Sequence, residues 1–185
     1  YKSGKSGTWT PISGKLMQIS VSVDGTHVWG VNSTHHVYYR ENDSWKRIDE
    51  LNSMKYISVS GDGQHVWGIA GNGRVYYRAG RNGVWEKDPT GVLKNVSVSG
   101  DGQHIWGVND ADTVFHRAGK SGQWDLIQGS LKHVSVSGDG LHVWGVNAGN
   151  NVFYRAGKDG DWQEMDGSLA HISVSGDGKL VWGVN

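Results

Sequence analysis

The sequence predicts an all-β fold, a β-propeller of five four-stranded antiparallel blades. An eleven-residue segment recurs five times, beginning at Ile19, Ile57, Val96, Val134 and Ile172, and its Trp-Gly pair returns every 38 or 39 residues. A second tryptophan accompanies each copy, and all ten tryptophans belong to these two series. No helical period of 3.6 residues is visible. A fixed period of this length indicates a repeat architecture in which neighbouring units bury one another's apolar faces.

Each repeat contains the pattern of four short strands. The first strand alternates β-branched residues with serine, and a Gly-Asp-Gly turn separates it from a strand containing the Trp-Gly pair. An aromatic third strand and a short fourth strand follow, and such a set describes one propeller blade. The serines suit the crowded axis of a ring, so the first strand is expected innermost. In one copy, the strands are expected at residues 133–137, 142–147, 152–155 and 162–165.

The two ends of the sequence fall at different points of the repeat. Residues 1–9 align with residues 154–162, so the chain begins inside a third strand, and it ends at Asn185, where a second strand closes. Together the ends predict a fifth blade, closed by pairing the N- and C-terminal strands and so hiding both sheet edges. We therefore expect one propeller domain over residues 1–185, with a sixth blade if the sequence is incomplete.

Charge and composition argue against several classes of function. Lys+Arg and Asp+Glu number 18 each, so no cationic surplus is present for nucleic acid or an anionic membrane surface. No apolar stretch approaches the ~18 residues of a membrane span, and no membrane insertion is expected. Without cysteine, disulfides and cysteine zinc sites are excluded. We expect secretion, with the cytoplasm as the alternative, and potential N-glycosylation at Asn32, Asn42 and Asn95.

The run GSLKHVSVSGDG, followed by HVWGVN and VFYRAGKDGDW within residues 129–162, resembles tectonin repeats. These repeats occur in fish egg lectins, a horseshoe-crab plasma lectin, slime-mould tectonins and mushroom tectonin lectins. The resemblance covers essentially the whole chain and recurs in every copy. It implies a propeller that binds carbohydrate at several shallow sites, in innate recognition or defence, with N-acetylglucosamine-type or O-methylated sugars as ligands. Known relatives usually carry six repeats, whereas this chain shows five.

Three recurring series are candidates for contact with carbohydrate. Asparagine can donate to and accept from a vicinal diol, arginine offers a fork of donors, and an outer tryptophan offers a stacking face. Their structural alternatives are a turn cap, pairing or stacking between blades, and blade packing. Ala70 replaces the asparagine in one copy, which predicts a weaker site there. The candidate residues are Asn32, Asn109, Asn147 and Asn185; Arg40, Arg78, Arg117 and Arg155; and Trp9, Trp45, Trp85, Trp124 and Trp162.

The remaining recurring residues are expected to be structural. The inner tryptophans (Trp29, Trp67, Trp106, Trp144 and Trp182) are assigned to the core. One carboxylate per Gly-Asp-Gly turn is too few for Ca²⁺, which needs six to eight oxygens, so turn chemistry is favoured over calcium and no metal or cofactor is expected. Calcium or another ion in the central tunnel stays an alternative. Histidines in the series that begins at His27 cannot share a metal unless they line the axis.

The even distribution of features over five blades argues against an enzyme, which needs one asymmetric site, and no nucleophile or phosphate-loop motif occurs. The sequence predicts a multivalent lectin whose partners are glycans on cell or microbial surfaces, and it leaves an oligomer open. The alternative is a protein-interaction scaffold without sugar binding, because fold alone does not assign function. A scaffold should carry one divergent patch, and the near-uniform blades favour the lectin.

Overall fold

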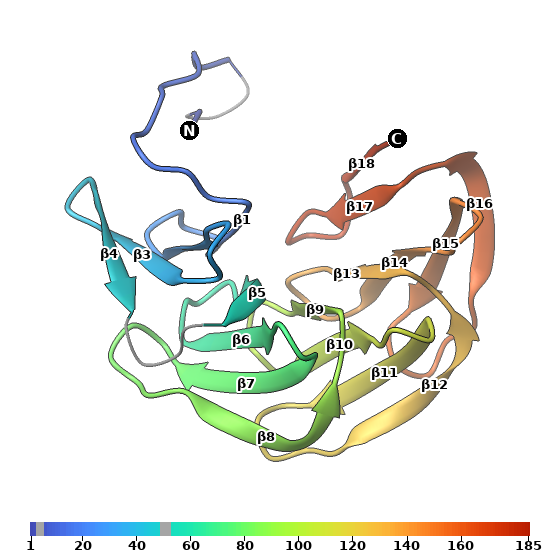
Figure 1. The fold of residues 1–185 in the computed structure, drawn as a ribbon. Coiled ribbons are helices and arrows are strands. Elements are labelled where there is room, and N and C mark those ends of the chain that lie inside the picture. Colours follow the sequence, from blue (N-terminus) through green and yellow to red (C-terminus); the bar gives the residue numbers. More distant parts are fainter. Residues whose placement is uncertain (3–5, 49–52) are drawn as a thin grey trace.

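The computed structural model describes residues 1–2, 6–48 and 53–185, and these contain strands but no helix. Four four-stranded antiparallel sheets and one two-stranded sheet fan out around a common axis (Figure 1). The predicted all-β, blade-like architecture is confirmed at this level. Each sheet takes its strands in sequence order, so every connection within a blade is a short hairpin turn. The described part of the chain contains no helix that could serve as a membrane span.

The blades follow the repeat. Blade 1 comprises β1 (Gln18–Val21), β2 (Val28–Val31), β3 (Val37–Glu41) and β4 (Ser44–Ile48). Blade 2 comprises β5 (Met54–Val59), β6 (His65–Ala70), β7 (Arg74–Ala79) and β8 (Glu86–Val92). Blade 3 comprises β9 (Asn95–Val98), β10 (His104–Val108), β11 (Thr113–Ala118) and β12 (Trp124–Ser130). Blade 4 comprises β13 (His133–Val136), β14 (His142–Val146), β15 (Asn151–Ala156) and β16 (Gln163–Ser168). The half-blade comprises β17 (His171–Val174) and β18 (Val181–Val184).

The core lies between successive blades. Apolar residues from two neighbouring sheets form each cluster, because a strand facing a blade on either side is covered on both faces. The inner tryptophans Trp29, Trp67 and Trp106 are fully buried there, as predicted, and Trp144 is half-buried. Trp182 is the exception: it is 73% exposed because no further sheet packs on the half-blade. The core assignment of Trp182 is therefore wrong in this structure.

The innermost strands surround an axial channel of about 350 Å³, and their serines line it. The expectation that these strands lie innermost is confirmed, and size is only part of the reason for serine. The Ser20 hydroxyl accepts a hydrogen bond from the Val59 N–H of the next blade at 2.9 Å. The same bond links Ser58 to Val98, Ser97 to Val136 and Ser135 to Val174, at 3.1–3.2 Å. Each serine therefore joins its blade to the next.

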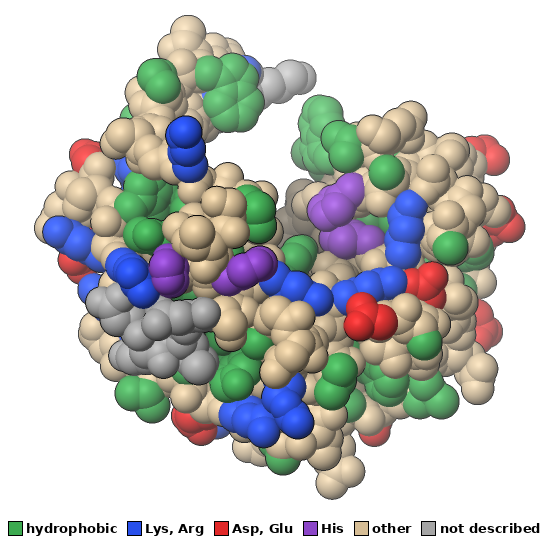
Figure 2. Space-filling model, in the orientation of Figure 1, with side chains coloured by type: hydrophobic (Ala, Val, Ile, Leu, Met, Phe, Trp, Pro, Cys, Tyr) green, Lys and Arg blue, Asp and Glu red, His purple; other side chains and the backbone are tan. Residues whose placement is uncertain are grey.

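The ring is open between the two ends of the chain, which face each other across the gap (Figure 1). The expected closing blade is not formed, because Lys2 pairs with Trp9 in a hairpin of its own while β18 pairs only with β17 among the described residues. Of the expected third strand, only Tyr1 and Lys2 are described, and residues 3–5 of the aligned segment lie outside the described residues. So short a strand offers β18 few hydrogen bonds. Figure 2 shows the resulting notch, with apolar side chains on both sides.

Candidate functional site

A hollow of about 680 Å³ lies between blades 2 and 3. One wall is the end of β8 with the following Leu93, and the other is the face of blade 3. Asn109, Arg117 and Trp124, one member of each predicted series, line it together with Phe115 and Gln123. The structure therefore brings the three kinds of predicted residue to one place, at the boundary between two blades.

The same arrangement recurs where the N-terminal segment meets blade 1. A hollow of about 240 Å³ there is lined by Gly14, Lys15, Leu16, Asn32, Tyr38 and Trp45. These residues occupy the same repeat positions as Gly91, Val92, Leu93, Asn109, Phe115 and Trp124 of the larger hollow. Blade 4 repeats the set against blade 3, with Gly129, Leu131, Asn147, Phe153 and Trp162. The residues that line the two hollows thus recur with the repeat.

Glycine sets the position of each outer tryptophan at these boundaries. A Cβ atom on Gly91 would lie 2.8 Å from the Trp124 Nε1, and one on Gly129 would lie 2.8 Å from the Trp162 Nε1. The indole edge therefore rests directly on the backbone of the preceding blade. Trp45, Trp124 and Trp162 are half-buried in consequence, and Trp85 is half-buried as well, as the sequence predicts for partly exposed rings. Trp9, in the N-terminal hairpin, is 79% exposed.

The arginines are held beneath these rings. The Arg117 guanidinium lies 5.6 Å from the centre of the Trp124 ring and 5.3 Å from that of Trp67 in blade 2. Its Nε donates to the Gly119 carbonyl oxygen and another nitrogen to that of Lys120. Arg78 and Arg155 make the corresponding bonds in their own loops. All three side chains are buried and support the tryptophan of their own blade, and Arg78 and Arg117 also contact a tryptophan of the preceding blade. This stacking is the structural alternative foreseen for the series.

Asp88 distinguishes the boundary between blades 2 and 3. Its Oδ1 accepts hydrogen bonds from the Thr90 and Gly91 N–H groups and from the Trp124 Nε1, at 3.0, 2.5 and 3.3 Å. Its Oδ2 pairs with the Arg117 Nη1 at 2.5 Å. The indole nitrogens of Trp85 and Trp162 have no such partner among the described residues. Sequence reasoning did not assign Asp88 to the site, although it takes a repeat position that holds isoleucine in blades 1 and 3.

The asparagines cap the turn between the second and third strands. The Asn109 Oδ1 accepts the Ala111 and Thr113 N–H groups at 3.0 and 2.9 Å. Asn32 accepts both equivalent groups in blade 1, and Asn147 accepts the Asn151 N–H in blade 4. The turn cap foreseen as the structural alternative is therefore present. It uses the amide oxygen and leaves the Nδ2 group of Asn109 without a protein partner among the described residues. A contact with ligand through that group stays a prediction.

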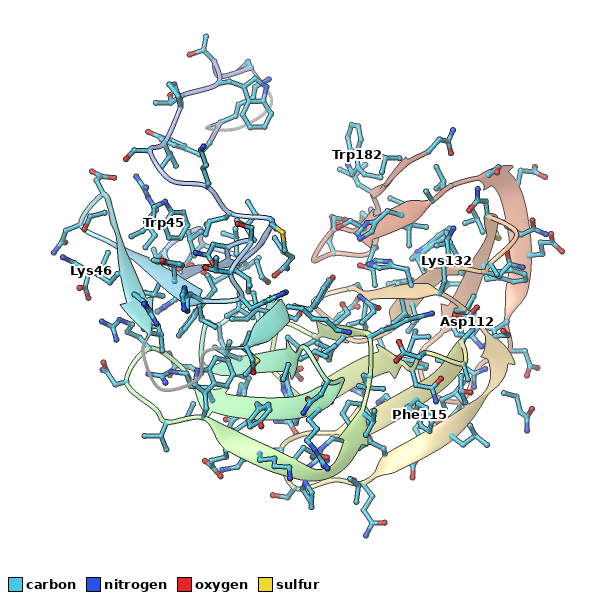
Figure 3. The ribbon with its side chains drawn as sticks, viewed as in Figure 1. Trp45, Lys46, Asp112, Phe115, Lys132 and Trp182 are labelled. Carbon is cyan, nitrogen blue, oxygen red and sulfur yellow. The ribbon has the colours of Figure 1, made fainter. Side chains whose placement is uncertain are left out.

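Some predicted residues line a third hollow or none. Trp9 and Arg40 line a hollow of about 710 Å³ beside the ring opening, which Trp45 borders as well. Figure 3 shows Trp45 and Trp182 on opposite sides of that opening. Asn185 is exposed at the end of the half-blade. Arg78 and Trp85 belong to the blade with Ala70, and residues 49–52, which precede that blade, lie outside the described residues.

The Gly-Asp-Gly turns and the recurring histidines make structural contacts. In each turn the carboxylate accepts from a serine hydroxyl and a backbone N–H; the hydrogen bond from Ser175 is the main reason that the pKa of Asp177 is lowered. Each histidine contacts the third strand of its blade, as in the 3.2 Å contact between the His27 Nδ1 and the Tyr39 hydroxyl. Among the described residues, no three His, Asp or Glu side chains are grouped to hold a metal ion.

The three glycosylation sequons differ in accessibility. Asn95 is only 3% exposed, and its Oδ1 accepts the Val134 N–H, so its amide cannot be glycosylated in the folded protein. The Asn32 amide is half-buried in its turn cap. Asn42 is exposed in the turn between β3 and β4. Only Asn42 therefore presents its amide freely in this structure.

The comparison with known families agrees with the repeat. Residues 105–185 match the family model of the Tectonin domain. None of the curated proteins matches the chain. The matched part covers most of blade 3, blade 4 and the half-blade, and blades 1 and 2 are further copies of the same unit. The resemblance to tectonin repeats is thereby confirmed for residues 105–185.

Proposed function

We propose that this protein is a multivalent carbohydrate-binding protein whose sites are the hollows between successive blades. The observation that carries the proposal is the recurrence of one set of lining residues at two separate boundaries, Gly14 to Trp45 and Gly91 to Trp124. Packing alone requires no open volume beside an aromatic ring. A repeated hollow that joins an aromatic face to polar groups is what a repeated small ligand requires.

The chemistry of the larger hollow suits a sugar. The half-buried faces of Phe115 and Trp124 can stack on the C–H face of a pyranose ring. The Asn109 Nδ2 group, the Gln123 amide and the Ser121 hydroxyl line the same hollow and can hydrogen-bond to sugar hydroxyls. A volume of about 680 Å³ has room for a mono- or disaccharide. In this proposal Arg117 holds the ring of Trp124 and does not itself contact the sugar.

Several weak sites fit a glycan-covered surface. When sites on one rigid ring engage a surface together, avidity exceeds single-site affinity by 10² or more. We extend the proposal to glycans on cell or microbial surfaces, with N-acetylglucosamine-type or O-methylated sugars as first candidates and a secreted location.

We also propose that the ring closes in solution, which adds a boundary. In blade 4, Trp144 lies opposite Tyr154, and the same register places Trp182 opposite Tyr1. The N-terminal hairpin pairs Lys2 with Trp9 as blade 3 pairs Arg117 with Trp124, so it already has the form of an outer strand pair. Closure would cover Trp182, which is now exposed.

The test is a glycan array followed by calorimetric titration with the monosaccharides that bind. Trp124→Ala is expected to weaken binding at its boundary at least tenfold. Leu126→Ala, an exposed residue of β12 outside the described hollows, is the matched control and should bind as the parent does. Absence of saccharide binding at millimolar concentration overturns the proposal. Recovery of a stoichiometric protein partner that free sugar does not displace would favour the scaffold.

A further inference from the structure

The blade boundaries share their lining residues but differ in what holds the outer tryptophan in place. Between blades 2 and 3, one oxygen of Asp88 accepts from the Trp124 Nε1 and from the Gly91 N–H. The other oxygen pairs with Arg117. Asp88 is 6% exposed, so little water competes for these contacts. The indole, its arginine and the opposite wall are thereby held in place before a ligand arrives.

The boundary between blades 3 and 4 has the same donors without the carboxylate. Arg155 donates to two carbonyl oxygens of its own loop, as Arg117 does, and its Nη1 has no protein partner among the described residues. The Trp162 Nε1 is buried and likewise has no partner there. Ile127 stands at the position of Asp88. Two donors that a carboxylate joins at one boundary are therefore unjoined at the next.

The remaining geometry of these two boundaries is closely similar. The Arg155 guanidinium lies 5.6 Å from the centre of the Trp162 ring, and the Arg117 guanidinium lies 5.6 Å from that of Trp124. The glycine that contacts each indole nitrogen is retained as well. The chain before that glycine is one residue longer in blade 2. The boundaries therefore differ chiefly at one buried side chain.

The smaller hollow, beside Trp45, also lacks the carboxylate. Ile12 stands there at the position of Asp88. Arg40 pairs instead with the exposed Asp43 of the turn in its own blade, so no ion pair crosses this boundary among the described residues. This hollow measures about 240 Å³, against about 680 Å³ at the boundary with the carboxylate.

We propose that Asp88 is a positioning residue that makes the hollow between blades 2 and 3 the tightest sugar site of the ring, and that boundaries without this carboxylate bind more weakly. The inference rests on the proposed function and adds that the sites are unequal. Ordering a side chain on binding opposes association. Because Asp88 orders the indole and the guanidinium on folding, less ordering remains for the ligand, and the same contacts give a higher affinity.

Calorimetric titration with N-acetylglucosamine, or with the monosaccharide that the glycan array selects, tests the inference. We expect one site per chain that is about tenfold tighter than the others. In crystals soaked at rising sugar concentration, the hollow between blades 2 and 3 should fill first. Asp88→Ile, which gives blade 2 the residue of blades 1 and 3, should remove the tight site and leave the weaker ones. Glu86→Gln, an exposed position of the same strand, is the control and should keep the tight site.

The converse change gives a readout that a loss of stability cannot produce. Ile127→Asp, with Gln128 replaced by the Pro-Thr pair that follows Asp88, places a carboxylate beside the unjoined donors of Arg155 and Trp162. It should create a second tight site, between blades 3 and 4. Far-UV circular dichroism shows whether each variant is folded.

Three results overturn the inference and leave the proposed function intact. They are equal affinity at all occupied boundaries of the parent, an unchanged tight site in folded Asp88→Ile, and a folded blade 3 variant without a second tight site. Absence of saccharide binding by the parent overturns both proposals, so the two failures are distinguishable.

Discussion

Asp88 of blade 2 and Arg117 of blade 3 form a buried ion pair across the blade boundary, with 2.5 Å between Oδ2 and Nη1. Ile48 and Ile127 occupy the position of Asp88 in blades 1 and 3, so a carboxylate replaces a buried apolar residue in this blade alone. The same carboxylate holds the Trp124 indole and the backbone of Gly91. One substitution thereby fixes both walls of the larger hollow.

Replacing Asp88 by asparagine should lower the free energy of unfolding by about 3 kcal/mol. The change preserves shape but leaves the buried Arg117 charge without its partner, and breaking a buried pair is strongly destabilising. Urea denaturation measures the effect. Glu86 lies on the same strand as Asp88 and forms an exposed ion pair with Lys120. Glu86→Gln removes that pair and should change the free energy of unfolding by less than about 1 kcal/mol. Equal effects of the two substitutions would show that the buried pair has no special weight.

Ser97→Ala should destabilise the protein by about 1 kcal/mol, because the buried Val136 N–H loses its acceptor in the next blade. Ser173→Ala is the matched control. Ser173 holds the same repeat position in the half-blade, where no further blade follows among the described residues. Its substitution should therefore be nearly neutral in the open ring, and as destabilising as Ser97→Ala if the ring closes. Denaturation of both variants provides the comparison. A neutral Ser97→Ala would mean that serine is present at the axis for its size alone.

His116→Tyr should reduce the loss of stability in acid. Burial and the neighbouring His104 lower the pKa of His116 to about 4, so between pH 6.5 and 4 the unfolded chain binds a proton that the folded protein does not. The free energy of unfolding therefore falls as pH falls through this range, by roughly 2–3 kcal/mol.

Tyrosine occupies this position in blades 1, 2 and 4 and removes that contribution. Thermal denaturation between pH 4 and 7 should show the parent and variant curves diverging toward acid. Parallel curves would contradict the assignment. His133 and His171 titrate identically in both proteins and cancel in the difference.

Closure of the ring predicts a specific cross-link. In blade 4, Val143 lies opposite Arg155. Val181 and Lys2 hold the same repeat positions, so they should lie opposite each other in a closed ring. Opposed residues on paired strands lie within the range of a disulfide bond. The chain has no native cysteine, so the double variant Lys2→Cys, Val181→Cys should oxidise to a single disulfide.

Non-reducing electrophoresis distinguishes the outcomes. A disulfide within one chain supports closure, and a linked dimer shows exchange of the hairpin between two copies. Free thiols after oxidation would indicate that the open ring persists in solution. Lys46→Cys with Val181→Cys is the control and should not cross-link, because Lys46 and Trp182, the chain neighbour of Val181, lie on opposite sides of the opening in Figure 3.

The sequence was sufficient to predict the blades because every copy of the repeat has the same pattern of residues. Serine alternation, the Gly-Asp-Gly turn and the Trp-Gly pair each fix a strand or a connection, and five repetitions remove ambiguity. The burial of Trp182 was mispredicted because the repeat implies a neighbouring sheet that the half-blade lacks. A residue's position within the repeat fixes its own strand, whereas its burial depends on what packs beside that strand.

The sequence predicted which types of residue line the candidate site, but not the contacts that each side chain makes. Arg117 was an equal candidate for ligand contact and for stacking between blades, and its burial between Trp67 and Trp124 depends on how two sheets pack. Asp88 was missed because it departs from the repeat, whereas the candidate residues were positions that recur. It is a buried carboxylate where blades 1 and 3 have isoleucine.

The hydroxyl-to-amide bonds at the axis are the same at each junction. Each of these bonds involves only two adjacent blades and does not depend on how many blades the ring contains. An extra copy of the unit could therefore be inserted by tandem duplication without changes in its neighbours. The number of blades is then set by the angle at which successive sheets pack, and lineages can gain or lose a blade in one genetic event.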